Sequence, residues 1–169
     1  MLWPKLLLVG SAVFTQRSLI NVHIEPASDA DGPSILQLLL PIDGLVEHLN
    51  TAVVARDGAA LLGCAALEVY PEGALLRSVV VAPAARGRGL GQQLTEAAIT
   101  LAESHRTPAV YLLTTTAESY FSRFGFVSVT REQVPASVQQ SIEFRSACPA
   151  SAIVMRKTLN GTVEEKLHA

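Results

Sequence analysis

The sequence predicts an α/β fold, a single domain in which a mixed, mostly antiparallel sheet is flanked by helices. Its 169 residues are 49% hydrophobic and 17% charged, which suits one domain with a substantial core. Apolar and polar residues alternate near the start, as in a strand, and apolar residues recur at helical spacing after Gly89. Asp57-Gly58 and Pro71-Glu72-Gly73 mark turns between consecutive strands, which indicates an antiparallel meander.

Strands are predicted over residues 22–25, 51–56, 61–70, 75–81, 110–114, 126–129 and 152–158. The run 110–114 is strongly apolar, which is typical of a strand buried on both faces. Because a long helical segment separates this strand from the one before it, the order of elements indicates a mixed sheet.

Helical segments are predicted between these strands. The first follows the N-cap candidates Ser28, Asp29 and Asp31 and buries Ile35, Leu36, Leu38 and Leu39, and a short second one carries Leu45, Val46 and Leu49. The longest covers residues 89–105 and buries the face formed by Leu90, Leu94, Ala97, Ala98 and Leu101. Two more cover residues 118–124, ended by Gly125, and 134–144, opened by Pro135.

Composition argues against several classes of function. The net charge of −2 provides no general attraction for nucleic acid or an anionic membrane, and aromatic residues make up only 5% of the chain. The two cysteines, Cys64 and Cys148, are too few for a disulfide scaffold. They lack the spacing of metal ligands, and the four histidines are scattered, so no metal centre is expected.

The two ends of the chain differ from its middle. Residues 1–20 contain a short apolar run after Lys5, about half the length that spans a bilayer. We interpret them as an N-terminal extension, with a cleaved secretory signal or an arm docked on the domain as alternatives. The domain itself is expected over residues 21–160, and residues 161–169 form a polar tail.

A glycine-rich turn after the strand 75–81 is the most informative stretch. Gly87, Gly89 and Gly91 open a long helix, whose first backbone amides and dipole favour an anion. Glycine lets the backbone approach a phosphate closely, and Arg86 and Arg88 add positive charge. The spacing fits neither a P-loop nor the dinucleotide fingerprint. The turn therefore predicts a phosphate or pyrophosphate site of another kind, with a turn that binds nothing as the alternative.

The run Arg86-Gly87-Arg88-Gly89-Leu90-Gly91 resembles the R/Q-x-x-G-x-G/A signature of the GNAT acetyltransferases, and residues 22–158 follow the element order of that fold. The resemblance implies acetyl-CoA as cosubstrate, bound where the strand 75–81 splays from the strand 110–114. It assigns the pantetheine arm and thioester to Val79, Val80 and Val81, with the N–H of Val80 or Val81 at the oxyanion. It assigns the pyrophosphate to the loop residues Arg86, Gly87, Arg88, Gly89, Leu90, Gly91 and Gln92.

Two charged residues on neighbouring apolar strands are candidates for the chemistry. Glu68 is the candidate base, because a partly buried carboxylate can remove a proton through water; a solvent-facing carboxylate is the alternative. Arg77 lies in an apolar strand, where an unpaired charge is costly. It either pairs with Glu68 across the hairpin or binds a substrate carboxylate.

The sequence departs from the family at the proton donor. Many GNAT enzymes carry a Tyr four residues before a Gly-Phe pair, but here that position, relative to Gly125-Phe126, is Phe121. The adjacent Tyr120 is rotated by about 100° and is expected to point elsewhere. A water molecule or an unprotonated thiolate are the other options for the leaving group. The family's Asn after the fifth strand is replaced by Thr114-Thr115-Thr116.

A closer resemblance narrows the acceptor. Residues 112–116, 120–126 and 134–135 are similar to the acetyltransferase domain of bacterial N-acetylglutamate synthase. Residues 63–65, 67–70, 75–79 and 148–152 resemble GNAT proteins of arsenic-resistance operons. The resemblance implies N-acetylation of a small amino acid, with an arsenic-containing analogue among the candidates. Expected acceptor contacts are Arg77, Ser78, Thr115, Arg145 and Ser146, while Cys148 is either an acceptor contact or a small buried apolar residue.

The sequence thus predicts a cytoplasmic N-acetyltransferase that uses acetyl-CoA and a small-molecule amine. No nucleic-acid or membrane partner is expected, and dimers are frequent in the family. Two alternatives stay open: a non-catalytic acyl-CoA sensor, suggested by the missing Tyr, and a protein or peptide N-acetyltransferase.

Overall fold

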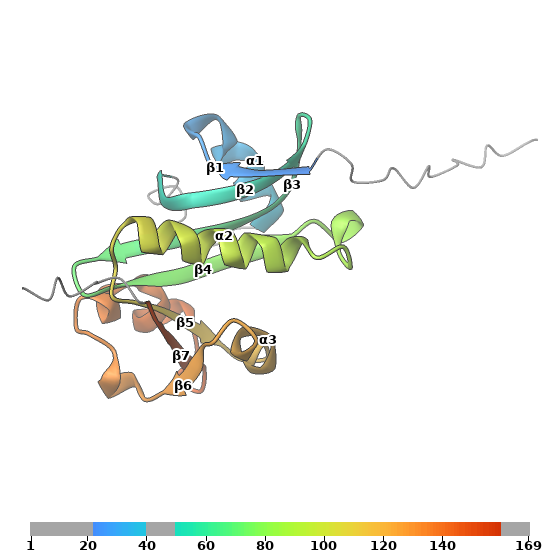
Figure 1. Cartoon of the computed structure of the whole chain (residues 1–169). Coiled ribbons are helices and arrows are strands. Elements are labelled where there is room, and N and C mark those ends of the chain that lie inside the picture. The colour runs from blue at the N-terminus through green and yellow to red at the C-terminus, as the bar shows by residue number, and fades with distance from the viewer. Residues whose placement is uncertain (1–21, 40–49, 160–169) are drawn as a thin grey trace, which may run out of the picture.

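The structure, a computed structural model, describes residues 22–39 and 50–159. Its strands and main helices are, in chain order, β1 (Val22–Pro26), α1 (Gly32–Leu39), β2 (Ala52–Asp57), β3 (Ala60–Tyr70), β4 (Gly73–Val81), α2 (Leu90–Ser104), β5 (Ala109–Thr114), α3 (Glu118–Ser122), β6 (Val127–Val129) and β7 (Ile153–Thr158) (Figure 1). All the predicted strands form, with ends within two residues of the expected ones. The predicted N-terminal extension, the helix with Leu45, Val46 and Leu49, and the polar tail lie outside the described residues.

One sheet contains these strands in the order β1-β2-β3-β4-β5-β7-β6. Every neighbouring pair is antiparallel except β4 and β5, which confirms a mixed, mostly antiparallel sheet. The parallel pair is short, because only Ala74–Val110 and Leu75–Tyr111 are in register. Beyond Leu75 the two strands part, as the family resemblance implies.

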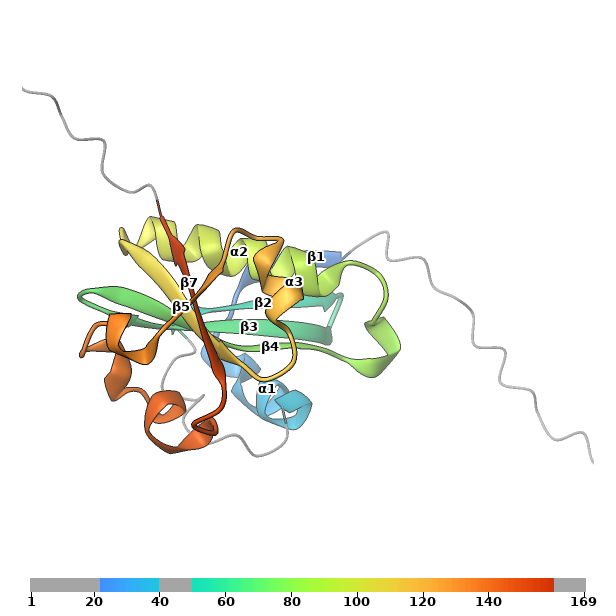
Figure 2. The same ribbon diagram turned by 90° about the horizontal axis from the view of Figure 1, so that it is seen from below.

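Helices cover the two faces of the sheet unequally (Figure 2). On one face α2 packs across the middle strands. On the other face Ile35 of α1 packs on β2 and β3, while Val134 and Val138, from the connection between β6 and β7, pack on β5 and β7. The sheet is therefore covered on both sides.

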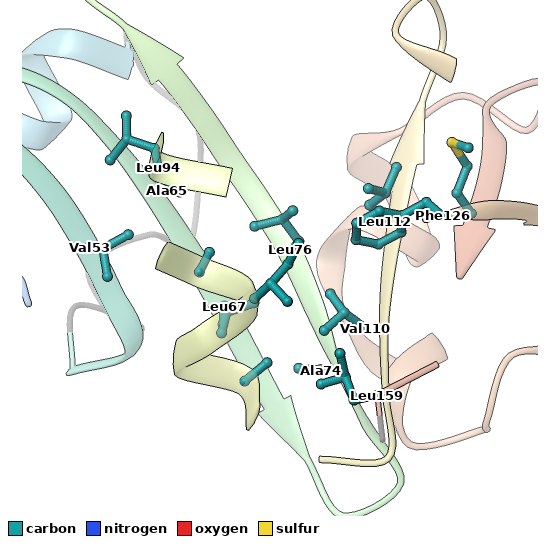
Figure 3. Packing of buried hydrophobic residues seen from close by; sticks show 14 of the residues in the cluster. Val53, Ala65, Leu67, Ala74, Leu76, Leu94, Val110, Leu112, Phe126 and Leu159 are labelled. Atoms are coloured by element: carbon teal, nitrogen blue, oxygen red, sulfur yellow. The ribbon is translucent and has the colours of Figure 1, made fainter. Parts of the chain in front are cut away.

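The largest buried cluster holds the two halves of the sheet together beneath α2 (Figure 3). It joins Leu67 and Leu76 of the first half to Val110 and Leu112 of the second. Leu94 of α2 is fully buried in it, and burial of one such side chain contributes about 1.5–3 kcal/mol. This cluster fixes the start of α2 above the end of β4.

Side chains along β4 change sheet face at Ser78. Ala74 and Leu76 lie in the cluster beneath α2, and Val79 and Val81 pack against the same cluster, so the alternation shifts by one residue. Ser78 absorbs the shift with a φ of +57°, a left-handed conformation that costs a serine roughly 1–2 kcal/mol. The pairing of β4 with β3 is irregular at the same place. The bulge lies where β4 parts from β5, a common position for a functional site.

The predicted helix over residues 134–144 is wrong. This segment contains the short 3-10 turn Val138–Gln140 and the π-helical turn Glu143–Ala147, separated by an extended residue. The side-chain amide of Gln139 donates a hydrogen bond to the Val134 carbonyl oxygen at 2.8 Å, which replaces helical backbone bonding. Val134 is nevertheless buried. The spacing of apolar residues therefore predicted the burial of Val134 correctly. It did not predict the backbone conformation, because the Gln139 side chain competes with the backbone for hydrogen bonds.

The first helix also differs in detail from its prediction. Ser28 caps a short turn at Asp29–Asp31, and α1 begins directly after it. Ile35 is 1% exposed, but Leu36 is 38% exposed, so the prediction that Leu36 is buried is wrong. Because consecutive helical residues are about 100° apart, Leu36 points away from the sheet that Ile35 faces, and Leu38 is half-buried.

Candidate active site

The glycine loop between β4 and α2 is exposed and open. Gly87 and Gly89 have φ values of +75° and +76°, which favour glycine. A Cβ atom at Gly87 would meet nothing within 4 Å, and one at Gly89 would meet only a side-chain nitrogen of Gln93, at 4.0 Å. Gly89 is the N-cap of α2 and gives no side-chain hydrogen bond to the helix. The first amides of α2 therefore have no side-chain cap, which fits an anion such as a phosphate group.

The predicted cofactor residues form one continuous stretch from the end of β4 into the first turn of α2. Val79, Val80 and Val81 are half-buried on β4, whereas Arg86 and Arg88 are exposed in the loop. Arg86 is held over the strand end because its Nε donates a hydrogen bond to the Val81 carbonyl oxygen at 3.1 Å. Further along, Leu90 is buried in the core, and the side chain of Gln92 donates to Glu96 at 3.0 Å. Because the side chains of Leu90 and Gln92 are already engaged, only their backbone amides can bind a ligand.

A cavity of about 90 Å³ lies where β4 parts from β5. The described residues that line it are Leu75, Leu76, Arg77, Ser78, Leu113 and Glu143. The hydroxyl oxygen of Ser78 is fully buried and has no hydrogen-bond partner among the residues that the structure describes. The surface that lines the cavity is mostly polar, although three leucines are among its residues, and it lies at the bulge of β4.

A buried ion network forms the polar end of this cavity. Arg77 pairs with Glu68 across the β3–β4 hairpin, which confirms one of its two predicted alternatives. Its Nη2 also lies 3.0 Å from Oε1 of Glu143. The hydroxyl of Tyr70 donates to the second oxygen of Glu68 at 2.5 Å, and the thiol of Cys148 donates to Oε2 of Glu143 at 3.0 Å. Two carboxylates therefore share one guanidinium.

Tyr70 and Cys148 remain protonated donors in this network. Burial and the hydrogen bond to Glu68 raise the pKa of the Tyr70 hydroxyl above its usual range. Burial, followed by the hydrogen bond to Glu143, raises the pKa of the Cys148 thiol to about 12. Burial alone raises the pKa of Cys64 to about 12, as expected for a core cysteine. At neutral pH the Tyr70 hydroxyl and the Cys148 thiol are therefore neutral, so Glu68 and Glu143 keep these hydrogen-bond donors.

Sequence reasoning did not find Glu143. It lies 75 residues after Glu68 in the chain, inside a segment that the sequence assigned to a helix, and no motif surrounds it. Only the π-helical turn Glu143–Ala147 brings its carboxylate to Arg77. A lone acidic residue in such a segment carries no sequence signal of a site.

Other predicted site residues lie outside the cavity lining. Thr115, Arg145 and Ser146 are exposed, and none of the three lines the cavity. Glu68 does not line it either, because its side chain is 3% exposed and both oxygens accept protein hydrogen bonds. The structure therefore brings Arg77 and Ser78 to the cavity and leaves Glu68 behind Arg77.

Tyr120 and Phe121 point in different directions. Phe121 packs against the core, with its ring centroid 5.9 Å from that of Phe126. The hydroxyl of Tyr120 lies 3.2 Å from Oγ1 of Thr95, a buried residue of α2, and would lie 3.3 Å from a Cβ atom at Gly91. Tyr120 thus sits over the first turn of α2, beside the glycine loop.

Within residues 22–39 and 50–159, no group of three or more His, Cys, Asp or Glu side chains is arranged to hold a metal ion. In the same residues, no helix is both long and apolar enough to cross a bilayer.

Comparison with known proteins shows a similarity to one family of enzymes. The family described as acetyltransferase (GNAT) domain matches residues 48–128. An amino-acid acetyltransferase from Ralstonia nicotianae is 29% identical over 127 residues, which is 67% of this chain but only 28% of the length of that relative.

Solved structures extend the likeness to most of the chain. N-acetylglutamate synthase from Neisseria gonorrhoeae, complexed with coenzyme A and N-acetyl-glutamate, superposes with a TM-score of 0.71 at 22% identity, over 82% of this chain and 35% of that one. Rv2747 from Mycobacterium tuberculosis, in complex with CoA and NLQ, gives a TM-score of 0.69 at 25% identity, over 81% of this chain and 99% of that one. With the splayed strands and the glycine loop, these matches show that the chain has the fold of the GNAT acetyltransferases, and that residues 48–128 are similar to their acetyltransferase domain.

Proposed function

We propose that the chain is an acetyl-CoA-dependent N-acetyltransferase that acetylates the amine of a small amino acid or amino-acid analogue. The observation that carries this proposal is the continuity of the open glycine loop with the gap between β4 and β5. One stretch, residues 79–92, can therefore bind both the phosphates and the thioester of one extended cosubstrate. The amino-acid acetyltransferase relative and the CoA complex of a protein of the same fold support it.

The residues of the loop fit acetyl-CoA. The space at Gly87 and Gly89 would be filled by any Cβ atom, and the uncapped amides of residues 90–92 can donate to the pyrophosphate. Arg86 and Arg88 add positive charge at the rim. Val79, Val80 and Val81 would hold the pantetheine arm along the parted edge of β4. When bound, acetyl-CoA supplies an acetyl group that is already activated for attack by a neutral amine.

The chain's own residues stabilise charge and position the reactants. The N–H of Val80, beside the bulge at Ser78, would donate to the negative charge that develops on the acetyl oxygen. Glu68, predicted as the base, holds Arg77 in place, and we propose that it acts on the reaction only through that arginine. Tyr120 or water would protonate the departing sulfur. Holding amine and acetyl group in contact supplies much of the remaining acceleration.

For the acceptor we propose a carboxylated amine, with arsenic- and phosphorus-containing amino acids among the candidates. Arg145, Ser146 and Thr115 would contact it from the exposed rim. We propose that residues 21–160 form the domain. We also propose a cytoplasmic location, where acetyl-CoA is available, and a homodimer as the assembly to test.

Arg145→Ala is expected to raise KM for a carboxylated acceptor roughly 10- to 100-fold with little change in kcat, because a charged hydrogen bond is lost. The measurement is steady-state thiol release at varied acceptor concentration. Arg106→Ala, in the exposed turn that follows the C-terminal end of α2, removes the same charge away from the site and serves as the control. An unchanged KM in Arg145→Ala would remove this residue from the acceptor site.

The proposed function is tested by acetyl-CoA turnover, followed as thiol release, against a panel of amino acids and their arsenic and phosphorus analogues. Release that depends on one carboxylated amine is the expected result. Tight CoA binding without release from any panel member would favour a sensor or a protein N-acetyltransferase, and absence of CoA binding would overturn the proposal.

A further inference from the structure

The hydroxyl of Tyr120 joins α3 to the first turn of α2. It lies 3.2 Å from Oγ1 of Thr95, a fully buried residue, and that oxygen lies 2.8 Å from the carbonyl oxygen of Gly91. Figure 2 shows α3 beside the start of α2, where this contact is made. Two residues 25 positions apart in the chain are thus connected at the helix turn whose amides we assign to the pyrophosphate.

The direction of these hydrogen bonds follows from the groups themselves. A threonine hydroxyl has one proton, and a carbonyl oxygen can only accept. The hydroxyl of Thr95 therefore donates along the shorter contact, to Gly91. Its oxygen is left as the acceptor of the other contact, so Tyr120 is the donor there. The proton of the Tyr120 hydroxyl is thus directed at Thr95.

Gly91 is a glycine for a different reason from Gly87 and Gly89. It lies inside α2, and its φ is not positive. A Cβ atom at this position would lie 3.3 Å from the Tyr120 hydroxyl and 3.8 Å from Cγ2 of Val81, whereas one at Gly87 would meet nothing. A contact of 3.3 Å is closer than the optimal separation of nonbonded atoms, about 3.5–4.0 Å. The Tyr120 hydroxyl therefore occupies the space that a side chain at Gly91 would need.

The ring of Tyr120 is fixed by its own surroundings. Its centroid lies 5.0 Å from that of Phe121 and 5.2 Å from that of Phe124, and the guanidinium carbon of Arg123 lies 5.0 Å from it. The end of α3 is held as well, because Nζ of Lys157 on β7 donates to the Phe124 carbonyl oxygen at 2.8 Å. Short as it is, α3 therefore supports the hydroxyl in one place.

We propose that Tyr120 is a positioning residue for acetyl-CoA, which acts through Thr95 and Gly91 on the first turn of α2. The inference rests on the proposed function and deepens its account of cosubstrate binding. The N-cap of α2 makes no side-chain hydrogen bond, so the first turn is held from α3 instead. A turn that is held before the pyrophosphate arrives loses less conformational freedom on binding.

The same hydrogen bonds bear on the departing sulfur. The bond between the carbonyl carbon and sulfur breaks with its electron pair on sulfur, and the thiolate then takes a proton. Because the Tyr120 proton is directed at Thr95, water is the donor in this arrangement. Tyr120 therefore affects the binding of acetyl-CoA and not the proton transfer.

The first experiment is a double-mutant cycle on CoA affinity, measured by calorimetry with the full chain. Tyr120→Phe keeps the ring and is expected to weaken CoA binding roughly 3- to 10-fold, because a neutral hydrogen bond is lost. Gly91→Ala is expected to weaken it by a similar factor in the wild-type chain, but by less than about 2-fold in the Tyr120→Phe background, where the methyl group has room. No effect of Tyr120→Phe, or an equal effect of Gly91→Ala in both backgrounds, would overturn the proposal.

Matched variants separate the hydroxyl contact from general damage. Thr95→Val keeps the shape but removes the hydroxyl, and we expect it to weaken CoA binding as Tyr120→Phe does. Thr95→Ser keeps the hydroxyl and is expected to retain the affinity to within about 2-fold. Tyr111→Phe removes another buried tyrosine hydroxyl, on β5, and is the control that leaves CoA affinity unchanged. Weaker binding in Tyr111→Phe by the same factor would overturn the assignment to Tyr120.

A kinetic readout distinguishes positioning from proton donation. For the best acceptor of the panel, Tyr120→Phe is expected to raise KM for acetyl-CoA, to change kcat less than about 3-fold and to leave the pH dependence of kcat unchanged. A loss of kcat of about 100-fold or more at an unchanged KM would make Tyr120 the general acid and overturn the proposal. CoA affinities that follow the cycle, without thiol release from any panel member, would remove the proposed function and keep the support of α2 by Tyr120.

Discussion

Replacing Gly89 with valine is expected to weaken acetyl-CoA binding at least about 100-fold. Gly89 has a φ of +76°, which a β-branched residue does not adopt, and it caps α2. Its missing side chain leaves open space in front of the first amides of the helix. Valine would fill the space that we assign to the pyrophosphate. Calorimetric titration of CoA into the variant provides the measurement.

The control for backbone strain is Gly58→Val. Gly58, in the turn between β2 and β3, has a φ of +60° and no atom within 4 Å of a Cβ. We expect the Gly58→Val variant to lose about as much stability as Gly89→Val and to keep its affinity for CoA. Gly89→Asn completes the test, because asparagine tolerates a left-handed backbone but still fills the space. We expect Gly89→Asn to recover stability without recovering binding. Full CoA affinity in Gly89→Asn would mean that the loop is only a turn.

Arg77→Ala is expected to destabilise the fold by about 3–5 kcal/mol. The substitution leaves the carboxylates of Glu68 and Glu143 without their shared guanidinium, and these side chains are 3% and 15% exposed. Removing one partner of a buried pair costs more than the pair contributes, because the remaining charge has no water to solvate it. The measurement is the midpoint of urea unfolding, with the slope compared to confirm an unchanged transition.

Arg56→Ala provides a matched comparison. Arg56 also bridges two carboxylates, Glu25 and Asp31, but its side chain is 21% exposed. Water can replace Arg56 at the exposed Glu25, and the buried Asp31 keeps its hydrogen bonds from Ser28. A loss of about 1 kcal/mol is therefore expected. If Arg77→Ala and Arg56→Ala lose similar free energies of unfolding, burial does not determine how much the Arg77 network contributes to stability. Because Arg77→Ala is expected to destabilise the fold, a higher KM in this variant is not evidence that Arg77 contacts the substrate.

The loop and the strands could be predicted because their determinants are local. The alternation around Leu67, the turn at Asp57-Gly58 and the glycines after β4 each act within a few residues, through backbone conformation and burial. The connection between β6 and β7 could not be predicted in the same way. There the side chain of Gln139 competes with helical hydrogen bonds, while the apolar residues are buried in either conformation.

By itself the sequence determined the α/β fold, the glycine turn with its two arginines, and the presence of Glu68 and Arg77 on neighbouring strands. These features depend on hydrophobic periodicity and on turn residues, which lie close together in the sequence. Only the tertiary structure decided how these charges are used. It paired Arg77 with Glu68, brought in Glu143 from 66 residues beyond Arg77 in the chain, and left the Ser78 hydroxyl facing a cavity. The physical reason is that the free energy of a buried charge depends on which groups the fold places around it, and those groups come from distant segments.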